Sequence, residues 1–254
     1  MATLSIIMPA YNEERRLERS LRSAVEFAAS SGMDTEVVVV DDGSSDRTVE
    51  IVEELQGEYP VIHLMRHGSN QGKGMAVRTG VLASEAEFAL FSDVDEAVPI
   101  REAGKLLDGA IAQEADVAIG TRYHPGSLIT KRQPWPRIAV SRGGNLLIRA
   151  LLLPGLRDTQ CGFKLFRTST MRPVLRRVTT SGFGFDLEVL AIARAWGRKI
   201  IEVAVTWAHG EGSTLRLGSA TWTVFRDLIK TTWRLRTGKY GQAPEEGGVT
   251  ADWG

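Results

Sequence analysis

Short apolar runs alternate with stretches of helical periodicity along residues 1–120. The apolar runs are short, as in buried strands, and lie at 4–8, 36–40, 61–65, 88–91 and 116–120; the run at 36–40 is rich in β-branched residues. Apolar residues recur at helical spacing at 12–29, 48–55, 74–83 and 101–112, and Asn12 is suited to cap the first of these helices. This alternation predicts an α/β fold: a doubly wound, mostly parallel sheet with helices on both faces.

The alternation weakens after residue 120. A basic loop at 123–137 precedes expected helices at 141–153 and 182–196 and a strand at 200–206. The last expected helix, 220–236, is apolar over half of its circumference and carries a basic stripe on the other side, Arg226, Lys230 and Arg234. We expect one domain over residues 1–218, a C-terminal amphipathic helix at 219–237 and a flexible tail at 238–254.

The composition excludes several classes of protein. The chain has 254 residues, 43% of them hydrophobic, and no net charge, which is typical of a globular protein and not of a disordered one. Cys161 is the single cysteine, so the sequence offers neither an internal disulfide nor a cysteine-based zinc site. No apolar run reaches the roughly 18 residues of a membrane-spanning helix, and the first residues lack a signal-peptide pattern. We therefore expect a cytoplasmic location.

Charge is divided unevenly along the chain. Residues 1–120 contain 10 Lys and Arg against 22 Asp and Glu, whereas residues 121–254 contain 21 against 9. The basic surplus of the second half favours an anionic partner, such as a phosphate group, a nucleic acid or a lipid surface.

Polar clusters follow three of the predicted strands where each strand ends. They are Tyr11-Asn12-Glu13, the run from Asp41 to Asp46, and Asp93 with Asp95. Because the carboxyl ends of parallel strands meet at one edge of a sheet, we expect a single site there. Asp93 and Asp95 lie on the same side of an extended chain, and paired carboxylates suit a divalent cation, Mg or Mn, which can also bind a diphosphate.

Further motifs narrow the interpretation. The first half contains Pro9-Ala10-Tyr11-Asn12-Glu13-Glu14, Asp41-Asp42-Gly43-Ser44-Ser45-Asp46, Asn70-Gln71-Gly72-Lys73-Gly74 and the Asp93/Asp95 pair. The second half contains Gly120-Thr121-Arg122-Tyr123, the run 158–166, Phe185-Asp186-Leu187-Glu188 and Glu211-Gly212-Ser213. In this order the motifs resemble family 2 glycosyltransferases of GT-A fold, and those of the second half are similar to dolichyl-phosphate β-glucosyltransferases and other polyprenyl-phosphate hexosyltransferases.

The resemblance implies a role for each matching residue. It makes residues 1–120 the nucleotide-sugar-binding half and residues 121–218 the acceptor half of the domain. Asp93 and Asp95 would bind the metal and the diphosphate, and Arg122 would contact a phosphate. The other implied substrate-binding residues are Pro9, Tyr11, Glu13, Asp41, Asp42, Ser44, Lys73, Arg78, Arg137, Asp158 and Lys164.

The resemblance also implies the reaction. It is an inverting transfer of a hexose, with glucose favoured over mannose, from UDP-glucose or GDP-mannose to a polyprenyl or dolichyl phosphate. A phosphate acceptor is already anionic at neutral pH and needs cations, for which Arg122 and Arg137 are candidates, more than it needs a base. No nucleic acid partner is implied.

Two alternatives remain open at this stage. A family 2 enzyme with a hydroxyl acceptor on a glycan or small molecule would need a general base, and Asp186 or Glu188 is the best candidate. A non-catalytic nucleotide-sugar-binding protein is the second alternative, because Glu96 stands where the family usually has glycine after the second aspartate. Glu96 would either add a metal ligand or crowd the site.

The helix at 219–237 predicts attachment to a membrane surface. Trp222 and Trp233, together with aliphatic residues and the basic stripe, suit a helix that lies in a lipid interface. We therefore expect the protein to be peripheral on the cytoplasmic face of a membrane.

Overall fold

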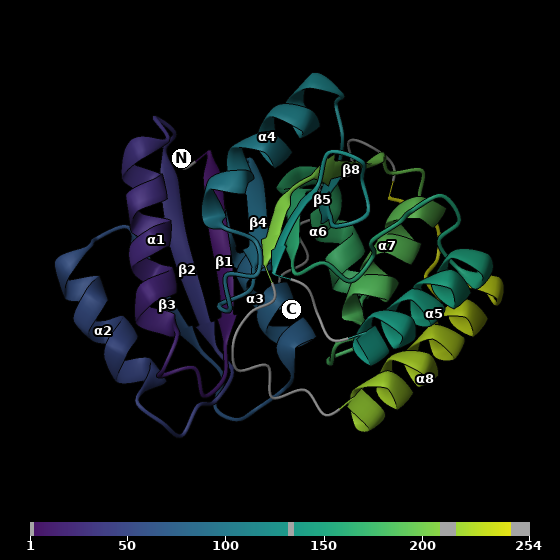
Figure 1. The fold of residues 1–254 in the computed structure, drawn as a ribbon, viewed down its shortest axis with the longest axis horizontal. Helices are drawn as coiled ribbons and strands as arrows, with labels where there is room; N and C mark the ends of the chain where they lie inside the picture. The colour runs from purple at the N-terminus through teal and green to yellow at the C-terminus, as the bar shows by residue number, and fades with distance from the viewer. Residues whose placement is uncertain (1–2, 132–134, 209–216, 245–254) are drawn as a thin grey trace.

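The computed structural model describes residues 3–131, 135–208 and 217–244, and a seven-stranded sheet forms its centre (Figure 1). The strand order is β3-β2-β1-β4-β7-β5-β8, and within this described sheet β7 alone runs antiparallel to its neighbours. Its strands are β1 (Leu4–Ala10), β2 (Thr35–Asp41), β3 (Ile62–Arg66), β4 (Phe88–Ser92), β5 (Val117–Thr121), β7 (Phe163–Arg167) and β8 (Ile200–Ala204). A short second sheet pairs β6 (Leu128–Lys131) with β9 (Thr206–Ala208). The predicted α/β class and mostly parallel sheet are confirmed.

Helices cover both faces of the sheet. They are α1 (Leu17–Ser30), α2 (Thr48–Glu58), α3 (Lys73–Ala83), α4 (Ala103–Ala112), α5 (Trp135–Leu151), α6 (Thr168–Arg177), α7 (Phe185–Ala195) and α8 (Leu217–Arg236). On one face α3 packs on α6, and α6 packs on α7. On the other face α1 packs on α2, and both α1 and α4 contact the 3-10 turn Ile100–Glu102. Helix α8 packs on α7 and lies beside α5, outside these layers (Figure 1).

Alternating strand side chains supply a core on each face. Ile7 and Val40 lie against Gly80 of α3, where a Cβ would come 2.4 Å from Ile7, so glycine allows the helix to approach the sheet closely. Val203 lies against Gly109 of α4. By strand register these two contacts are on opposite faces. Both faces therefore bury apolar residues, which explains why the strands are continuous apolar runs.

The first helix begins later than the sequence predicts. Helix α1 starts at Leu17, and Asn12 does not cap it. Asn12 instead has a left-handed backbone, φ 54°, and its Oδ1 accepts the N–H of Ser45 at 2.9 Å. The segment from Tyr11 to Arg16 is thereby held as a loop against the turn after β2.

Four elements of the second half were not predicted, among them β9, which follows β8 where a single strand was expected. Strand β7 and helix α6 follow each other directly at 163–177, and β6 lies inside the segment expected to be a loop. The predicted last helix is present as α8. Within the described ranges, no helix combines the length and the apolar character that crossing a bilayer requires.

Candidate active site

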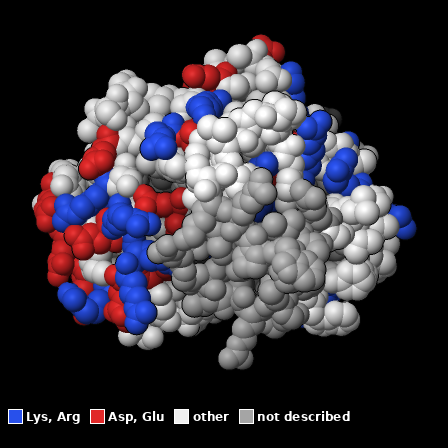
Figure 2. Space-filling model, viewed as in Figure 1, with Lys and Arg blue, Asp and Glu red and all other residues white. Residues whose placement is uncertain are grey.

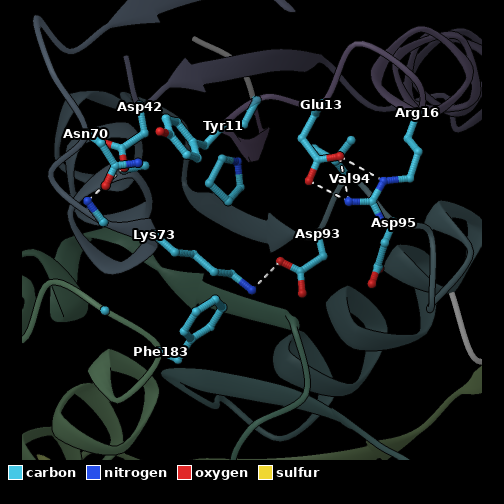
Figure 3. A pocket seen from close by; sticks show the side chains of 15 residues that line it. Tyr11, Glu13, Arg16, Asp42, Asn70, Lys73, Asp93, Val94, Asp95 and Phe183 are labelled. Atoms are coloured by element: carbon cyan, nitrogen blue, oxygen red, sulfur yellow. Dashed lines mark hydrogen bonds and ion pairs between the residues drawn. The ribbon is translucent and has the colours of Figure 1, made fainter. Parts of the chain in front are cut away.

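A cavity of about 430 Å³ opens at the carboxyl ends of β1, β2 and β4, where the three polar clusters meet (Figure 3). Strand ends, the loop before α3 and the segment before α7 all contribute to it. Its lining consists of Pro9, Ala10, Tyr11, Glu13, Arg16, Asp42, Asn70, Gly72, Lys73, Ala76, Asp93, Val94, Asp95, Gly182 and Phe183. The single site expected at this edge of the sheet is therefore present as one cavity.

The loop after β1 supplies one wall. The Glu13 carboxylate accepts two N–H groups from the Arg16 guanidinium, at 2.8 and 2.7 Å, and both side chains reach the cavity (Figure 3). Burial raises the pKa of Glu13; the Arg16 charge opposes this, while the nearby Asp95 and Asp93 carboxylates add to it. Tyr11, at the rim, is 47% exposed.

Hydrogen bonds tie this loop to the turn after β2. The Asn12 N–H donates to Ser44 Oγ at 2.9 Å, and the Glu13 N–H donates to Thr48 Oγ1 at 2.8 Å. Ser44 thus joins two loops and does not line the cavity. Asp41 is buried and accepts the Ser44 N–H at 3.2 Å; its contact with a nucleotide base stays a prediction.

Asp42 shapes the turn that precedes α3. Its carboxylate accepts the N–H groups of Gln71 (2.9 Å) and Gly72 (2.7 Å), and His67 Nδ1 lies 2.7 Å from Oδ1. The other ring nitrogen of His67 lies 3.0 Å from Thr79 Oγ1. Asp42 therefore reaches the cavity mainly as the anchor of this turn, and His67, which sequence reasoning missed, orients it.

Asp93 and Asp95 follow β4 and both face the cavity (Figure 3). The Lys73 ammonium lies 2.6 Å from Asp93 Oδ1. Gly162 lies directly behind Asp93: the Asp93 N–H donates to the Gly162 carbonyl at 3.1 Å, and a Cβ at Gly162 would come 1.8 Å from Asp93 Oδ2. Only glycine leaves room there for the Asp93 side chain as it stands.

The two aspartates fit a divalent cation that the substrate helps to bind. Among the described residues, no group of three or more His, Cys, Asp or Glu forms a protein cage for a metal. Magnesium is commonly held by one or two carboxylates, with phosphate oxygens and water as the other ligands. Burial raises the pKa of Asp93. The Lys73 charge lowers it in part, and the Asp95 carboxylate raises it further. A cation between these carboxylates would relieve their mutual repulsion.

Glu96 does not enter the cavity. It keeps the left-handed backbone that a glycine would adopt, φ 49°, and its carboxylate accepts an N–H of Arg19 on α1 at 2.7 Å. The Glu96 carboxylate is therefore paired with Arg19 and is not part of the cavity lining.

Behind the cavity, Lys164 and Asp186 form a buried ion pair at 2.7 Å. Lys164 is fully buried and also donates to the Cys161 carbonyl. Burial raises the pKa of Asp186, and Lys164 opposes that effect. Neither residue lines the cavity. The expected contact of Lys164 with substrate and the expected role of Asp186 as a base therefore stay predictions; in this structure the two side chains pair with each other.

Arg122 and Asp158 form a second internal pair. The guanidinium donates to Asp158 at 2.7 and 2.8 Å, the Arg122 backbone N–H donates at 3.0 Å, and the Trp207 ring lies 5.4 Å from the guanidinium. Although burial opposes it, Asp158 raises the pKa of Arg122. Both residues lie outside the cavity lining, so contact of Arg122 with a phosphate stays a prediction.

Glu188 is held by donors from three segments. It accepts the N–H groups of Thr179 (2.9 Å) and Thr180 (2.6 Å), the Tyr240 hydroxyl (2.7 Å) and a more distant N–H of Arg234 on α8. Burial raises the pKa of Glu188, but these hydrogen bonds lower it by more, so that the pKa lies below its usual value. Glu188 therefore positions the segment that leads to Phe183, and its expected role as a base stays a prediction.

The structure thus divides the predicted site residues into two sets. Those that line the cavity are Pro9, Tyr11, Glu13, Asp42, Lys73, Asp93 and Asp95. Those outside its lining are Asp41, Ser44, Arg78, Arg122, Asp158, Lys164, Asp186 and Glu188. Arg78 donates instead to the Leu175 carbonyl at 2.9 Å. The Arg137 side chain and the motif at 211–213 lie outside the described residues.

Besides His67, sequence reasoning missed three contributors to the site. Arg16 and Phe183 line the cavity, and Gly162 supports Asp93 from behind. The Gly162 signal was available, since this glycine lies in the 158–166 motif, but its proximity to Asp93 depends on the pairing of β7 with β4.

This sheet, with its carboxylate-lined cavity at the strand ends, is that of a glycosyltransferase of GT-A fold. The chain belongs to glycosyl transferase family 2, which matches residues 5–174. Similar relatives named dolichyl-phosphate β-glucosyltransferase occur in Dictyostelium discoideum (32% identity; 92% of this chain and 75% of the relative), Saccharomyces cerevisiae (31%; 89% and 73%) and Homo sapiens (30%; 93% and 77%).

Solved structures show the same fold. Glucosyl-3-phosphoglycerate synthase from Mycobacterium tuberculosis, solved with Mn²⁺, uridine-diphosphate-glucose and phosphoglyceric acid, has a TM-score of 0.66 at 18% identity, over 91% of this chain and 80% of that one. The same enzyme with Mg²⁺ and uridine-diphosphate has a TM-score of 0.67 at 19% identity, over the same shares. At this level of identity the likeness concerns the fold.

Proposed function

We propose that this glycosyltransferase moves a glucosyl group, with inversion, from a nucleoside-diphosphate sugar such as UDP-glucose to a polyprenyl or dolichyl phosphate. The relatives' names support glucose as the sugar and the lipid phosphate as the acceptor. One observation carries the choice of acceptor. A hydroxyl acceptor would use Asp186 or Glu188 as a base, but Asp186 pairs with Lys164, and Glu188 accepts hydrogen bonds from backbone and hydroxyl donors away from the cavity.

The cavity lining suits the donor. Tyr11 offers an exposed ring at the rim for a nucleoside, and the turn anchored by Asp42 forms the adjoining wall. Asp93 and Asp95 would hold Mg²⁺ or Mn²⁺ with the diphosphate; such a cation neutralises charge that develops on the leaving diphosphate. Lys73 adds a positive charge at the same place. These charges are aimed at the leaving group, where they contribute most to the rate.

A phosphate acceptor fits the position of the two carboxylates expected as a base, Asp186 and Glu188, which lie outside the cavity lining. A phosphate monoester has a second pKa of about 6 and is largely dianionic at neutral pH, so its oxygen attacks without losing a proton to the protein. That oxygen forms the bond to the sugar C1 while the C1 bond to the diphosphate oxygen breaks, and the nucleoside diphosphate leaves. The protein's tasks are to orient the two anions and to offset their repulsion.

Transfer of radiolabelled glucose tests this function. With UDP-glucose, Mg²⁺ or Mn²⁺ and a polyprenyl phosphate in detergent, we expect the label to pass into the organic phase. The matched control acceptor is the same polyprenol without its phosphate, which should receive no label. GDP-mannose serves as the donor control. Transfer to the free alcohol, or to a water-soluble glycan only, would favour the hydroxyl-acceptor alternative, and donor binding without transfer would favour a non-catalytic protein.

The same proposal places the protein on a membrane surface through α8. The outer side of α8 exposes Trp222 (68%), Ile229 (52%) and Trp233 (54%) beside Arg226 and Lys230. In the neighbouring α5, Leu146, Leu147 and Leu151 are also exposed. On the face shown in Figure 2, acidic and basic side chains are mixed over α1 and α2, whereas the right-hand edge of the view shows basic side chains among mostly uncharged ones. Aromatic residues with a basic flank suit an anionic lipid interface.

Helix α8 differs from the wheel drawn from its sequence. Leu228 is buried and Leu235 partly buried, so part of the apolar half packs on the protein. Arg234 turns toward Thr179 and Glu188, so the basic stripe at the surface consists of Arg226 and Lys230. The exposed tryptophans therefore lie next to the basic residues, an arrangement that lets both meet a lipid surface together.

Vesicle flotation tests the membrane proposal. We expect salt-sensitive co-flotation with anionic vesicles, and its loss when Trp222 and Trp233 are both changed to Ser. Ile111→Ser is the matched control, because Ile111 is an apolar residue of α4 with 55% exposure, away from α8. Equal flotation of the double variant and wild type would contradict the role of α8.

A further inference from the structure

Lys73 holds the carboxylate that the cation would use. Its ammonium lies 2.6 Å from Asp93 Oδ1, 5.1 Å from the centre of the Phe91 ring and 5.7 Å from that of Phe183. Figure 3 shows the ammonium directed at Asp93, on the side of the cavity where Asp95 also lies. The faces of two aromatic rings and a carboxylate thus stabilise a positive charge at this position.

An ammonium and a divalent cation compete for one carboxylate oxygen. Magnesium sits about 2.1 Å from its oxygen ligands, so with Lys73 in its present place the two cations would be at most about 4.7 Å apart. Their repulsion is strong in a half-buried site, where water screens less than in bulk solvent. Binding of the metal to Asp93 is therefore weakened while the ammonium stays at this oxygen.

We propose that Lys73 is the resident counter-ion of Asp93, which opposes cation binding in the donor-free protein, and that the donor diphosphate draws the ammonium off Asp93. The inference rests on the proposed function, since it assumes a diphosphate donor and a cation at Asp93 and Asp95. When the metal binds the Asp93 carboxylate, Lys73 loses its negatively charged partner, and the diphosphate replaces that partner. Nucleotide and cation then bind cooperatively, and by linkage each raises the affinity of the other by the same factor.

The surroundings of Lys73 allow this exchange. Its backbone is fixed, because the Gly74 N–H donates to the Ser181 carbonyl at 2.7 Å, but its side chain is 24% exposed and ends in the cavity. Lys164, on the other side of Phe91, contrasts with it: that ammonium is fully buried between Asp186 and the Cys161 carbonyl. The Lys73 side chain can therefore move toward an anion that enters the cavity, whereas Lys164 is held in place by its buried partners.

Titration of the protein with Mn²⁺, with and without UDP, measures this coupling directly. Free Mn²⁺ is followed by electron paramagnetic resonance, which needs no turnover. We expect Lys73→Met to bind Mn²⁺ at least about tenfold more tightly than wild type in the absence of UDP, and the enhancement by UDP to shrink by a similar factor. Lys105→Met is the matched control, because Lys105 also pairs with a carboxylate, Glu102 at 2.6 Å, but on α4. It should behave as wild type.

Further variants make the outcome decisive. Lys73→Gln keeps a polar head group and replaces Lys73→Met if the latter does not fold. Adding Asp93→Asn to the Lys73 variant should abolish the gain in Mn²⁺ affinity. Equal Mn²⁺ affinity of wild type and Lys73 variants without UDP, or a gain that survives Asp93→Asn, would overturn the role of Lys73 while the cation site stands. Absence of Mn²⁺ binding to wild type at saturating UDP would instead refute the cation role in the proposed function, and this inference with it.

Discussion

The two halves of the domain use charged residues in opposite ways. In the first half Glu13, Lys73, Asp93 and Asp95 face an open cavity. In the second half, Arg122 with Asp158 and Lys164 with Asp186 face each other, outside the cavity lining. All of them belong to motifs that resemble the same enzyme family. A motif residue thus either lines the cavity or pairs with another charged residue inside the protein.

Burial explains why the second set is paired. An isolated charge removed from water is costly, so buried charges persist where an opposite charge and hydrogen bonds compensate them. One of the pairs also lies close to the cavity: β7 carries Lys164 directly opposite Phe91 of β4, two residues before Asp93. The second half therefore contributes to the first by the pairing of β7 with β4.

The largest expected effect is on turnover, and it comes from the charged residues that line the cavity. Asp95→Ala should lower kcat about a thousandfold, roughly 4 kcal/mol in activation free energy, because a cation ligand beside the leaving diphosphate is lost. The unfolding midpoint should change little. Asp108→Ala, an exposed aspartate of α4, is the control for both measurements. Normal turnover in excess chelator would refute the role of Asp95 in binding metal.

The next effect is on stability and comes from the buried side. Asp158→Asn leaves the Arg122 guanidinium buried without its counter-charge, and we expect unfolding in denaturant to be about 3 kcal/mol easier. Replacing the pair together, by Arg122→Met and Asp158→Leu, should recover part of that loss. If Arg122→Gln raised the acceptor KM without loss of stability, Arg122 would belong with the cavity residues instead.

A smaller effect should come from the contact between the halves. Gly162→Ala introduces a Cβ at the place of Asp93 Oδ2, so the carboxylate must move. We expect kcat to fall about thirtyfold, roughly 2 kcal/mol, with a folded protein and weakened Mn²⁺ binding in the presence of UDP. Gly104→Ala on α4, where the added Cβ meets nothing within 4 Å, is the control. Unchanged metal affinity would show that Asp93 tolerates the shift.

The smallest effect is expected at Glu96. Glu96→Gly restores the residue usual in the family at a left-handed backbone position and removes a partner of Arg19, which is 72% exposed. Exposed ion pairs contribute about 0–1 kcal/mol, and relief of the backbone offsets that, so stability should stay within about 0.5 kcal/mol. Turnover and its metal dependence should equal wild type. A marked change in Mn²⁺ affinity would return Glu96 to the metal site.

The first half was predictable because its signals are local. The strands at 4–8 and 36–40 were found as β1 and β2 because strands covered on both faces are continuous apolar runs, and their polar ends located the site. Strand β7 was missed because Lys164 interrupts its apolar run, and the partner that makes this charge acceptable, Asp186, comes 22 residues later in α7. Helix α6 was missed because Pro173 stands inside it.

The site was predictable to the same extent. Asp93 and Asp95 were placed correctly because the end of a strand is visible in one dimension. Phe183 and Arg16 come from loops whose positions depend on tertiary hydrogen bonds, such as those that Glu188 accepts from Thr179 and Thr180. The sequence showed which residue types were available, but not which of them would pair internally.

The antiparallel strand β7 also has a consequence for synthesis of the chain on the ribosome. Strand β4 ends at Ser92, but its outer neighbour in the sheet begins at Phe163, and β5 joins the sheet only through that neighbour. Until residues 163–167 have emerged, β4 presents an open edge, which is a template for pairing with other chains. A nascent or truncated chain that ends after β5 therefore carries most of the motif residues of the cavity but lacks the strand that closes its sheet. Closure of the β4 edge, and with it protection from aggregation, therefore depends on a short segment that carries none of the residues lining the cavity.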